Sequence, residues 1–129
     1  MDRWELKPLQ SIGDIRFGMS RDEVHGLFHC ECKEFKKTKF SVNTTDDYGN
    51  FHVFYDADNK VEAVEIFEGI EVILNNTVVF PVETREILTR LPGTVQEEKY
   101  FTNIELSIGL EVTDENADNF LAGRAGYYE

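Results

Sequence analysis

The sequence predicts an α+β protein in which two short helices pack on one face of a mainly antiparallel sheet. Two amphipathic segments carry helix start signals, and the stretches around them alternate polar and apolar residues with a period of two. The expected order of elements is α-β-β-β-β-α-β-β. A chain of 129 residues with 41% hydrophobic content suits one hydrophobic core, so we expect a single domain over residues 1–129.

The first helix is predicted to begin at residue 20. Ser20 is a favourable N-cap, and Glu23 three residues later completes the sequence pattern of a capping box. The apolar stripe of this helix consists of Met19, Val24, Leu27 and Phe28.

Period-two alternation then predicts an antiparallel meander. Its four strands are expected over Lys39–Asn43, Phe51–Tyr55, Val61–Phe67 and Ile70–Leu74. Turn-forming residues lie at 46–50 and 58–60 between them, and the pair at 75–76, Asn-Asn, fits a tight hairpin.

A second helix is predicted over Pro81–Leu91. Proline suits the first helical position, and the Pro-Gly pair at 92–93 is a stop signal. Two further strands are expected over Thr94–Phe101 and Ile104–Val112, the second alternating most regularly. In the tail, residues 114–129, we expect a short helical turn and docking of the final tyrosine pair on the body.

The two helical segments also align with each other as a faint internal repeat. The matched positions are Ile15, Phe17, Glu23, Val24 and Phe28 on Val78, Phe80, Glu86, Ile87 and Leu91. Chance similarity between two amphipathic helices is the alternative interpretation.

The charge of the chain is large and unevenly placed. The formal net charge is −12. Residues 1–40 hold 8 basic and 7 acidic side chains, whereas residues 41–129 hold 5 basic and 18 acidic ones. Such a surface repels nucleic-acid phosphates and anionic membranes, so neither is an expected partner. Ordinary solubility charge is the alternative explanation.

Several classes of protein do not fit the sequence. No apolar run suggests a signal peptide or a membrane span, and the two cysteines are one residue apart, which disfavours a disulfide between them. A cytoplasmic protein with reduced thiols is expected. No glycine-rich phosphate loop, GxSxG or HExxH motif occurs, so we expect neither an enzyme nor a resident cofactor.

A zinc site is an alternative that the sequence raises. His25 and His29 share a helix face at spacing four, and Cys30 and Cys32 follow directly. A closed site would need all four donors to converge from one helix end, and Gly26 weakens that helix. A helix terminus without metal is therefore the favoured interpretation.

An acidic face with tyrosines is the candidate binding site. Glutamates recur at spacing three through the meander into its next strand, and aspartates occupy its turns. The residues expected to contact a partner are Asp46, Asp47, Tyr48, Tyr55, Asp56, Asp58, Glu62, Glu65, Glu68 and Glu71. Carboxylates interleaved with tyrosines suit a basic protein, because charge speeds encounter and aromatics anchor the contact.

Two segments carry a resemblance to known proteins. The sequence Ile15-Arg-Phe-Gly-Met-Ser-Arg-Asp-Glu-Val, followed by residues 51–66, resembles small bacterial proteins that combine an FGMS-x-x-EV helix opening with a Y-D-x-D-x-K-V-x-x-V hairpin, including domains similar in layout to the β-lactamase inhibitor protein. Size, acidity and the ending Gly126-Tyr-Tyr-Glu are similar to immunity proteins of polymorphic and contact-dependent toxin systems. The resemblance implies a binder without catalysis that covers a toxin's active site.

The expected function is therefore that of an immunity protein. It would bind and neutralise a basic toxin domain, a nuclease being the favoured class, with carboxylates of the 46–71 region in place of phosphates. One alternative is a small-ligand or regulatory domain whose pocket is lined by Phe51, Phe54 and Phe67, and another is a zinc-dependent function. The sequence leaves the oligomeric state open.

Overall fold

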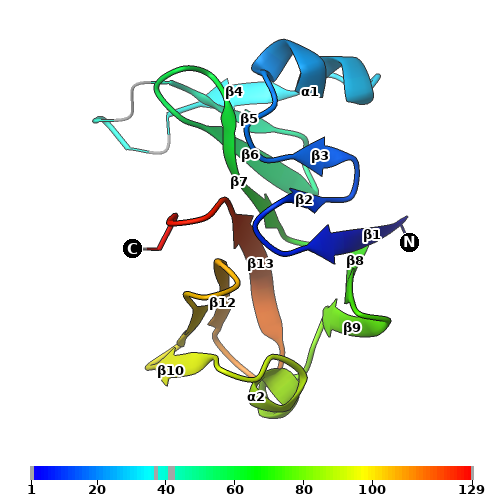
Figure 1. Ribbon diagram of the computed structural model, residues 1–129, viewed down its shortest axis with the longest axis vertical. Helices are drawn as coiled ribbons and strands as arrows, with labels where there is room; N and C mark the ends of the chain where they lie inside the picture. Colours follow the sequence, from blue (N-terminus) through cyan, green and yellow to red (C-terminus); the bar gives the residue numbers. More distant parts are fainter. Residues whose placement is uncertain (1, 37, 41–42, 129) are drawn as a thin grey trace.

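The computed structural model describes residues 2–36, 38–40 and 43–128, which form two β-sheets and two short helices (Figure 1). The strands are β1 (Asp2–Lys7), β2 (Ser11–Ile12), β3 (Ile15–Arg16), β4 (Lys33–Phe35), β5 (Thr45–Asp47), β6 (Phe51–Tyr55), β7 (Val61–Ile66), β8 (Ile70–Leu74), β9 (Thr77–Phe80), β10 (Val95–Glu97), β11 (Tyr100–Asn103), β12 (Ile108–Val112) and β13 (Ala117–Gly123). The helices are α1 (Arg21–Leu27) and α2 (Ile87–Arg90), and a 3-10 turn, η1 (Thr84–Glu86), precedes α2.

The larger sheet has eight strands in the order β10-β11-β12-β13-β7-β6-β5-β4, and every neighbouring pair is antiparallel. The smaller sheet has the order β3-β2-β1-β8-β9, in which only β1 and β8 run parallel. The prediction of a mainly antiparallel α+β fold is confirmed at this level. The single sheet and the predicted order of elements are wrong in detail, because β8 leaves the meander and pairs with β1.

The hydrophobic core lies between the eight-stranded sheet and a layer made of α1, α2 and the smaller sheet. Phe120 on β13 is fully buried and lies 6.0 Å from Phe80 of the smaller sheet, ring centre to ring centre. Trp4 packs edge-on against Phe51 of β6 at 4.9 Å. We call the core side of the eight-stranded sheet its inner face and the opposite side its outer face. Figure 1 shows the two helices at opposite ends of the long axis.

The eight-stranded sheet consists of two four-stranded meanders, β4 to β7 and β10 to β13, joined edge to edge. Their last strands pair antiparallel, with Val64 opposite Ala122 and Ile66 opposite Phe120. Each meander has an irregularity in its final hairpin, at Tyr55 in the first half and at Val112 in the second. The two halves are therefore related by an approximate twofold axis between β7 and β13.

The contacts that attach each helix also repeat. The residue before α1, Ser20, bridges to Lys60 at the start of β7, and Glu83 before η1 bridges to Asn116 at the start of β13. Val61 donates its N–H to the carbonyl of Met19, and the equivalent bond joins Ala117 to Val82. The internal repeat predicted from five matched positions is confirmed by these paired contacts.

Helix α1 begins as the sequence predicts. Ser20 accepts a hydrogen bond from the Glu23 N–H at 3.2 Å, and the Glu23 carboxylate accepts one from the Ser20 N–H at 3.2 Å. Val24 is fully buried, whereas Leu27 stays 38% exposed. The capping box therefore fixes the start of α1, which places its first two turns against the eight-stranded sheet.

Replacing Ser20 by alanine is expected to lower the free energy of unfolding by about 1 kcal/mol, because the first turn of α1 loses its cap. Urea unfolding followed by circular dichroism measures this loss. Thr89→Ala, at an exposed position in α2, is the control and should change stability by less than about 0.5 kcal/mol. Equal stability of the Ser20 variant and the wild type would contradict a capping role.

The second helix is shorter than predicted. Instead of Pro81–Leu91, helical structure covers only η1 and α2, and it ends at the predicted Pro-Gly stop. The residues before η1 are extended because Val82 and Glu83 pair with the start of β13. Tertiary pairing thus takes up what would have been the first helical turn.

Three predicted elements of the meanders are corrected. The expected turn at 46–50 begins later, since Asp46 and Asp47 belong to β5. Of the predicted strand Lys39–Asn43, residues 41 and 42 lie outside the described residues, and the others are not in a strand. The predicted strand Thr94–Phe101 is a hairpin of β10 and β11, with Glu98 at a φ of 55° in its turn.

The C-terminal half contains two further corrections. Residues 104–107 form a turn rather than the start of a strand, because the Asn103 side chain accepts the Leu106 N–H at 2.9 Å. The tail was expected to hold a helical turn, but it forms β13, which is hydrogen-bonded to β12 and β7 on its two edges. The docking of the final tyrosines is confirmed, since Tyr128 packs on Gly109. None of the helices in the described residues is long and apolar enough to cross a membrane.

Candidate functional site

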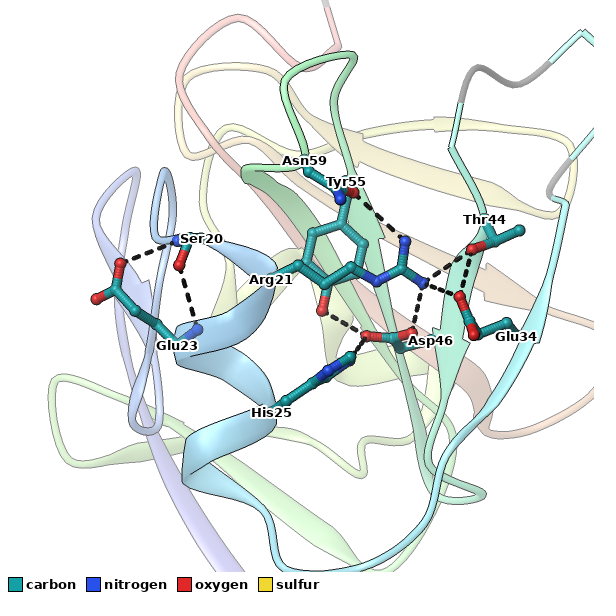
Figure 2. Close-up of polar contacts among 9 residues, drawn as sticks. All are labelled: Ser20, Arg21, Glu23, His25, Glu34, Thr44, Asp46, Tyr55 and Asn59. Atoms are coloured by element: carbon teal, nitrogen blue, oxygen red, sulfur yellow. Dashed lines mark hydrogen bonds and ion pairs between the residues drawn. The ribbon is translucent and has the colours of Figure 1, made fainter.

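A buried carboxylate lies at the centre of the polar cluster between α1 and the sheet. Asp46 has no solvent exposure. Its Oδ1 accepts a hydrogen bond from Arg21 Nη2 at 2.6 Å, and its Oδ2 accepts one from the Tyr55 hydroxyl at 2.7 Å. His25 Nε2 lies 2.7 Å from the same Oδ2 (Figure 2). We refer to Arg21, His25, Asp46 and Tyr55 as the Asp46 cluster.

The fold positions this cluster from two directions. Arg21 and His25 are four residues apart on α1 and therefore project from one side of the helix. Asp46 on β5 and Tyr55 on β6 point from the inner face of the sheet toward them (Figure 2). The Arg21 guanidinium also lies over the Tyr55 ring, 4.6 Å from its centre. Glu34 on β4 accepts a second bond from Arg21 Nη2 at 2.9 Å.

The charges in the cluster are strongly coupled. Burial alone would raise the pKa of Asp46, but hydrogen bonds from Arg21, Tyr55 and His25 outweigh it and hold the pKa below its usual range. Burial, followed by the hydrogen bond to Asp46, raises the pKa of Tyr55, so this phenol remains a donor. Asp46 is therefore an anion whose oxygens are already oriented by three neighbours.

The second half of the fold builds the same junction without charge. Asp46 pairs with Val53 on the inner face, and in the second meander Phe101 pairs with Leu110 at the equivalent position. Tyr55 stands next to the strand irregularity, where the second half has Val112. Both replacements are buried, Phe101 at 2% and Val112 at 7% exposure.

The helix positions equivalent to Arg21 and His25 also lack charged side chains in the second half. The alignment that places Val24 on Ile87 places Arg21 on Thr84 and His25 on Leu88. A buried ion pair commonly adds little net stability compared with apolar side chains of similar volume. Since this fold closes the second junction with the buried Phe101 and Val112, and has the uncharged Thr84 and the 48% exposed Leu88 at the helix positions, it does not require the Asp46 cluster. The cluster is therefore a candidate functional site, where local rules of stability are often broken.

A thiol completes a set of possible metal ligands at this site. His25, Cys32 and Asp46 present ligand atoms that all lie within 4.8 Å of one another. Burial, and then the Asp46 charge, raise the pKa of the Cys32 thiol, which is hydrogen-bonded to Tyr48 and Asp46. The zinc alternative from the sequence is corrected in its ligands. Only His25 and Cys32 of its four donors belong to this set, while His29 and Cys30 are exposed outside it.

No protein-family model, no curated protein and no solved structure matches the chain.

The ten residues expected to contact a partner do not form one face. Asp46 and Tyr55 are buried in the cluster and cannot contact a partner on the surface. Glu71 belongs to β8 in the other sheet, where it pairs with Arg3 at 3.2 Å. A spacing of three does not keep side chains on one side of a strand, because strands alternate with a period of two.

The turn residues among the ten have structural roles or stand apart. Asp56 accepts the N–H groups of Asp58 and Lys60 and bonds Arg124 at 2.7 Å, which orders the β6–β7 turn. Glu62 also lies near Arg124, at 3.6 Å. Asp58 and Glu68 lie in exposed turns. Tyr48 is half-buried and stacks on Phe51.

Two of the ten, Asp47 and Glu65, lie on the outer face. Asp47 pairs across the strands with His52, and Glu65 lies opposite His52 on β7. His52 packs edge-on against Phe67 at 4.6 Å and against Phe35 at 5.1 Å. At these two positions the outer face therefore carries carboxylates next to aromatic rings.

The pocket predicted for a small ligand is not formed. Phe51 belongs to the core on the inner face, whereas Phe54, three residues later on the same strand, points to the outer face. Phe67 is among the aromatics around His52. The three phenylalanines therefore do not line one cavity.

The outer face of the second meander is hollowed instead. A hollow of about 260 Å³ has Glu65 and Glu111 on its wall together with Tyr100 and Tyr128. Tyr128 reaches it because Gly109 leaves room for the phenol on β12. Burial raises the pKa of Tyr128, so its hydroxyl stays protonated beside the two carboxylates.

Proposed function

We propose that the protein binds and neutralises a basic protein, in the manner of an immunity protein that covers a toxin's active site. The observation that carries this proposal is the outer face with its acidic, aromatic hollow. Both helices and the smaller sheet cover the inner face, whereas no helix or strand of the described residues covers the outer face of the eight-stranded sheet. The turn that carries Tyr127 and Tyr128 lies against this face, on Gly123 and Gly109, and Phe54 and Ala63 of the first meander are buried on it.

The hollow suits one basic side chain better than a small organic ligand. Pockets for drug-sized ligands measure about 300–1,000 Å³, and this one is smaller, at about 260 Å³. A lysine or arginine from the partner would place its charge beside Glu65, since Glu111 already pairs with Lys99 at 3.1 Å, and the rings of Tyr100 and Tyr128 would lie beside its aliphatic part. Tyrosines in such positions are common anchors of protein interfaces.

The charge of the chain supports a basic partner. The net charge of −12 arises almost entirely in residues 41–129, which include most of the eight-stranded sheet. An electrostatic field of this sign raises the association rate of a basic protein, and the effect declines as salt screens it. Carboxylates of the outer face would then occupy sites that a nuclease uses for phosphates.

The direct test is complex formation with the protein encoded immediately upstream in the genome. The two purified proteins are mixed at low salt and separated by size exclusion, and inhibition of the partner's activity is measured in parallel. A stoichiometric complex that abolishes the activity supports the proposal. Absence of any complex at low salt contradicts it.

Glu65→Lys is expected to slow association with that partner about tenfold at low salt, because it reverses a charge in the hollow. Surface plasmon resonance over a salt series measures this change, and the difference from wild type should shrink as salt rises. Glu5→Lys makes the same charge change at an exposed position of β1 and should alter the rate less than about threefold. Equal effects of the two variants would show that net charge acts without a defined face.

A further inference from the structure

We propose that His25, Cys32 and Asp46 bind a zinc ion at the junction of α1 and the eight-stranded sheet, with one position left for water. The donors are an imidazole nitrogen, a thiolate sulfur and a carboxylate oxygen, which together favour Zn²⁺ over the oxygen-seeking Mg²⁺ and Ca²⁺. Three protein ligands and one exchangeable position are the usual arrangement of a zinc site open to solvent.

The present geometry is close to what zinc requires. In a tetrahedral site with bonds of about 2.0–2.3 Å, neighbouring ligand atoms lie roughly 3.4 to 3.7 Å apart. His25 Nε2 and Asp46 Oδ2 are 2.7 Å apart, and the whole set of ligand atoms lies within 4.8 Å. Movements of about one ångström would therefore form the site, with the metal taking the place of the proton between imidazole and carboxylate.

The neighbours of Asp46 already hold it as zinc ligands are usually held. Arg21 binds Oδ1, which leaves Oδ2 to face His25 and Cys32, and the Tyr55 hydroxyl fixes the orientation of Oδ2. Such hydrogen bonds to the ligands orient them and strengthen metal binding. Asp46 is buried and His25 is 44% exposed at its side chain, so a metal would enter from the side of His25.

The charges also balance when the metal is present. Asp46, Glu34 and an ionised Cys32 contribute three negative charges, and Arg21 and Zn²⁺ contribute three positive ones. Arg21 lies within 2.9 Å of both carboxylates. A half-buried site is less costly when its charges sum to zero.

The second half of the fold supplies an internal comparison. At the positions of His25 and Asp46 it has Leu88 and Phe101, neither of which can bind a metal. The fold therefore forms without these donors, and their presence together in the first half calls for a role other than packing. Binding of zinc supplies that role and does not depend on the outer face.

Cobalt(II) titration of the reduced 129-residue protein tests the site, because the absorption spectrum of bound cobalt depends on its ligands. We expect one equivalent of Co²⁺ to give tetrahedral ligand-field bands and a thiolate-to-cobalt charge-transfer band, both removed by Zn²⁺. Cys32→Ser should abolish the charge-transfer band, and His25→Gln should weaken cobalt binding at least about tenfold. The thiols are kept reduced during the titration by a phosphine chosen because it does not compete for the metal ion.

Matched controls lie beside the ligands. Cys30→Ser and His29→Gln remove the same atom types at exposed neighbouring positions, and both should bind cobalt as the wild type does. Circular dichroism of every variant checks that it is folded. We expect His25→Gln and Cys32→Ser to fold, because neither residue belongs to the hydrophobic core. Absence of a stoichiometric band in the wild type overturns the proposal, and so does a band that requires Cys30 rather than Cys32.

Discussion

Asp46→Ala is expected to lower the free energy of unfolding by about 3–5 kcal/mol, because it breaks a buried ion pair from one side. Arg21, whose side chain is only 12% exposed, would keep its charge in a half-buried place with Glu34 as its remaining anionic partner. The Tyr55 hydroxyl would lose its acceptor. Urea unfolding measures the loss, and Asp58→Ala in an exposed turn should stay within about 0.5 kcal/mol of wild type.

The second half of the fold suggests a second variant whose stability can be compared with that of Asp46→Ala. A variant that takes all four of its equivalent residues should fold and be more stable than Asp46→Ala. The four changes are Arg21→Thr, His25→Leu, Asp46→Phe and Tyr55→Val. Replacing a whole buried ionic group by packed apolar side chains is often neutral or stabilising. If this variant is no more stable than Asp46→Ala in urea unfolding, the two junctions are not interchangeable.

Phe120→Ala is expected to cost about 3–5 kcal/mol as well, for the different reason that it leaves a cavity in the core. Phe120 is fully buried on β13 and packs against Phe80 of the smaller sheet. Because β13 also joins the two meanders, both halves should still unfold in one transition, at a midpoint lowered by about 10–20 °C.

Scanning calorimetry distinguishes this outcome from its alternatives. The control is Phe40→Ala, whose side chain is 83% exposed and whose loss should leave the midpoint nearly unchanged. Two separate transitions in the Phe120 variant would contradict a shared core between the halves. A change below about 1 kcal/mol would mean that the core closes around the missing ring.

Elements that depend on local signals could be predicted from the sequence. The start of α1 follows from the Ser20–Glu23 capping box, which needs only four consecutive residues. Strand β6 and most of β7 follow from alternation between turn-forming residues, and their bounds agree with the structure to within one residue. The Asn75–Asn76 hairpin follows because both residues tolerate positive φ, which they adopt at 50° and 65°.

Elements that depend on distant partners could not be predicted from the sequence. Strand β8 looks like the next strand of the meander, but its partner is β1, more than sixty residues earlier in the chain. Strand β13 contains Asp118 and Asn119, which have low strand propensity, and it is held by pairing on both edges. Neither pairing leaves a local mark in the sequence.

The sequence singled out His25, Cys32, Asp46 and Tyr55 but did not join them with Arg21 in one site, for a related reason. Asp46 stands in a stretch of turn-forming residues, so nothing local indicates that it is a buried strand residue. Arg21 offered one usable signal, since a cation in the first turn of a helix opposes the helix dipole and needs another partner. The internal repeat offered a second, because it places Arg21 and His25 on residues without charge.

The way the eight-stranded sheet ends has a consequence for self-association. Its two edge strands, β4 and β10, are each three residues long, and all six residues are exposed. A long, flat edge would offer unpaired backbone groups to another copy and so promote aggregation, whereas short edges carrying charges such as Lys33 and Glu97 offer few. Growth of the eight-stranded sheet from molecule to molecule is therefore disfavoured at both ends.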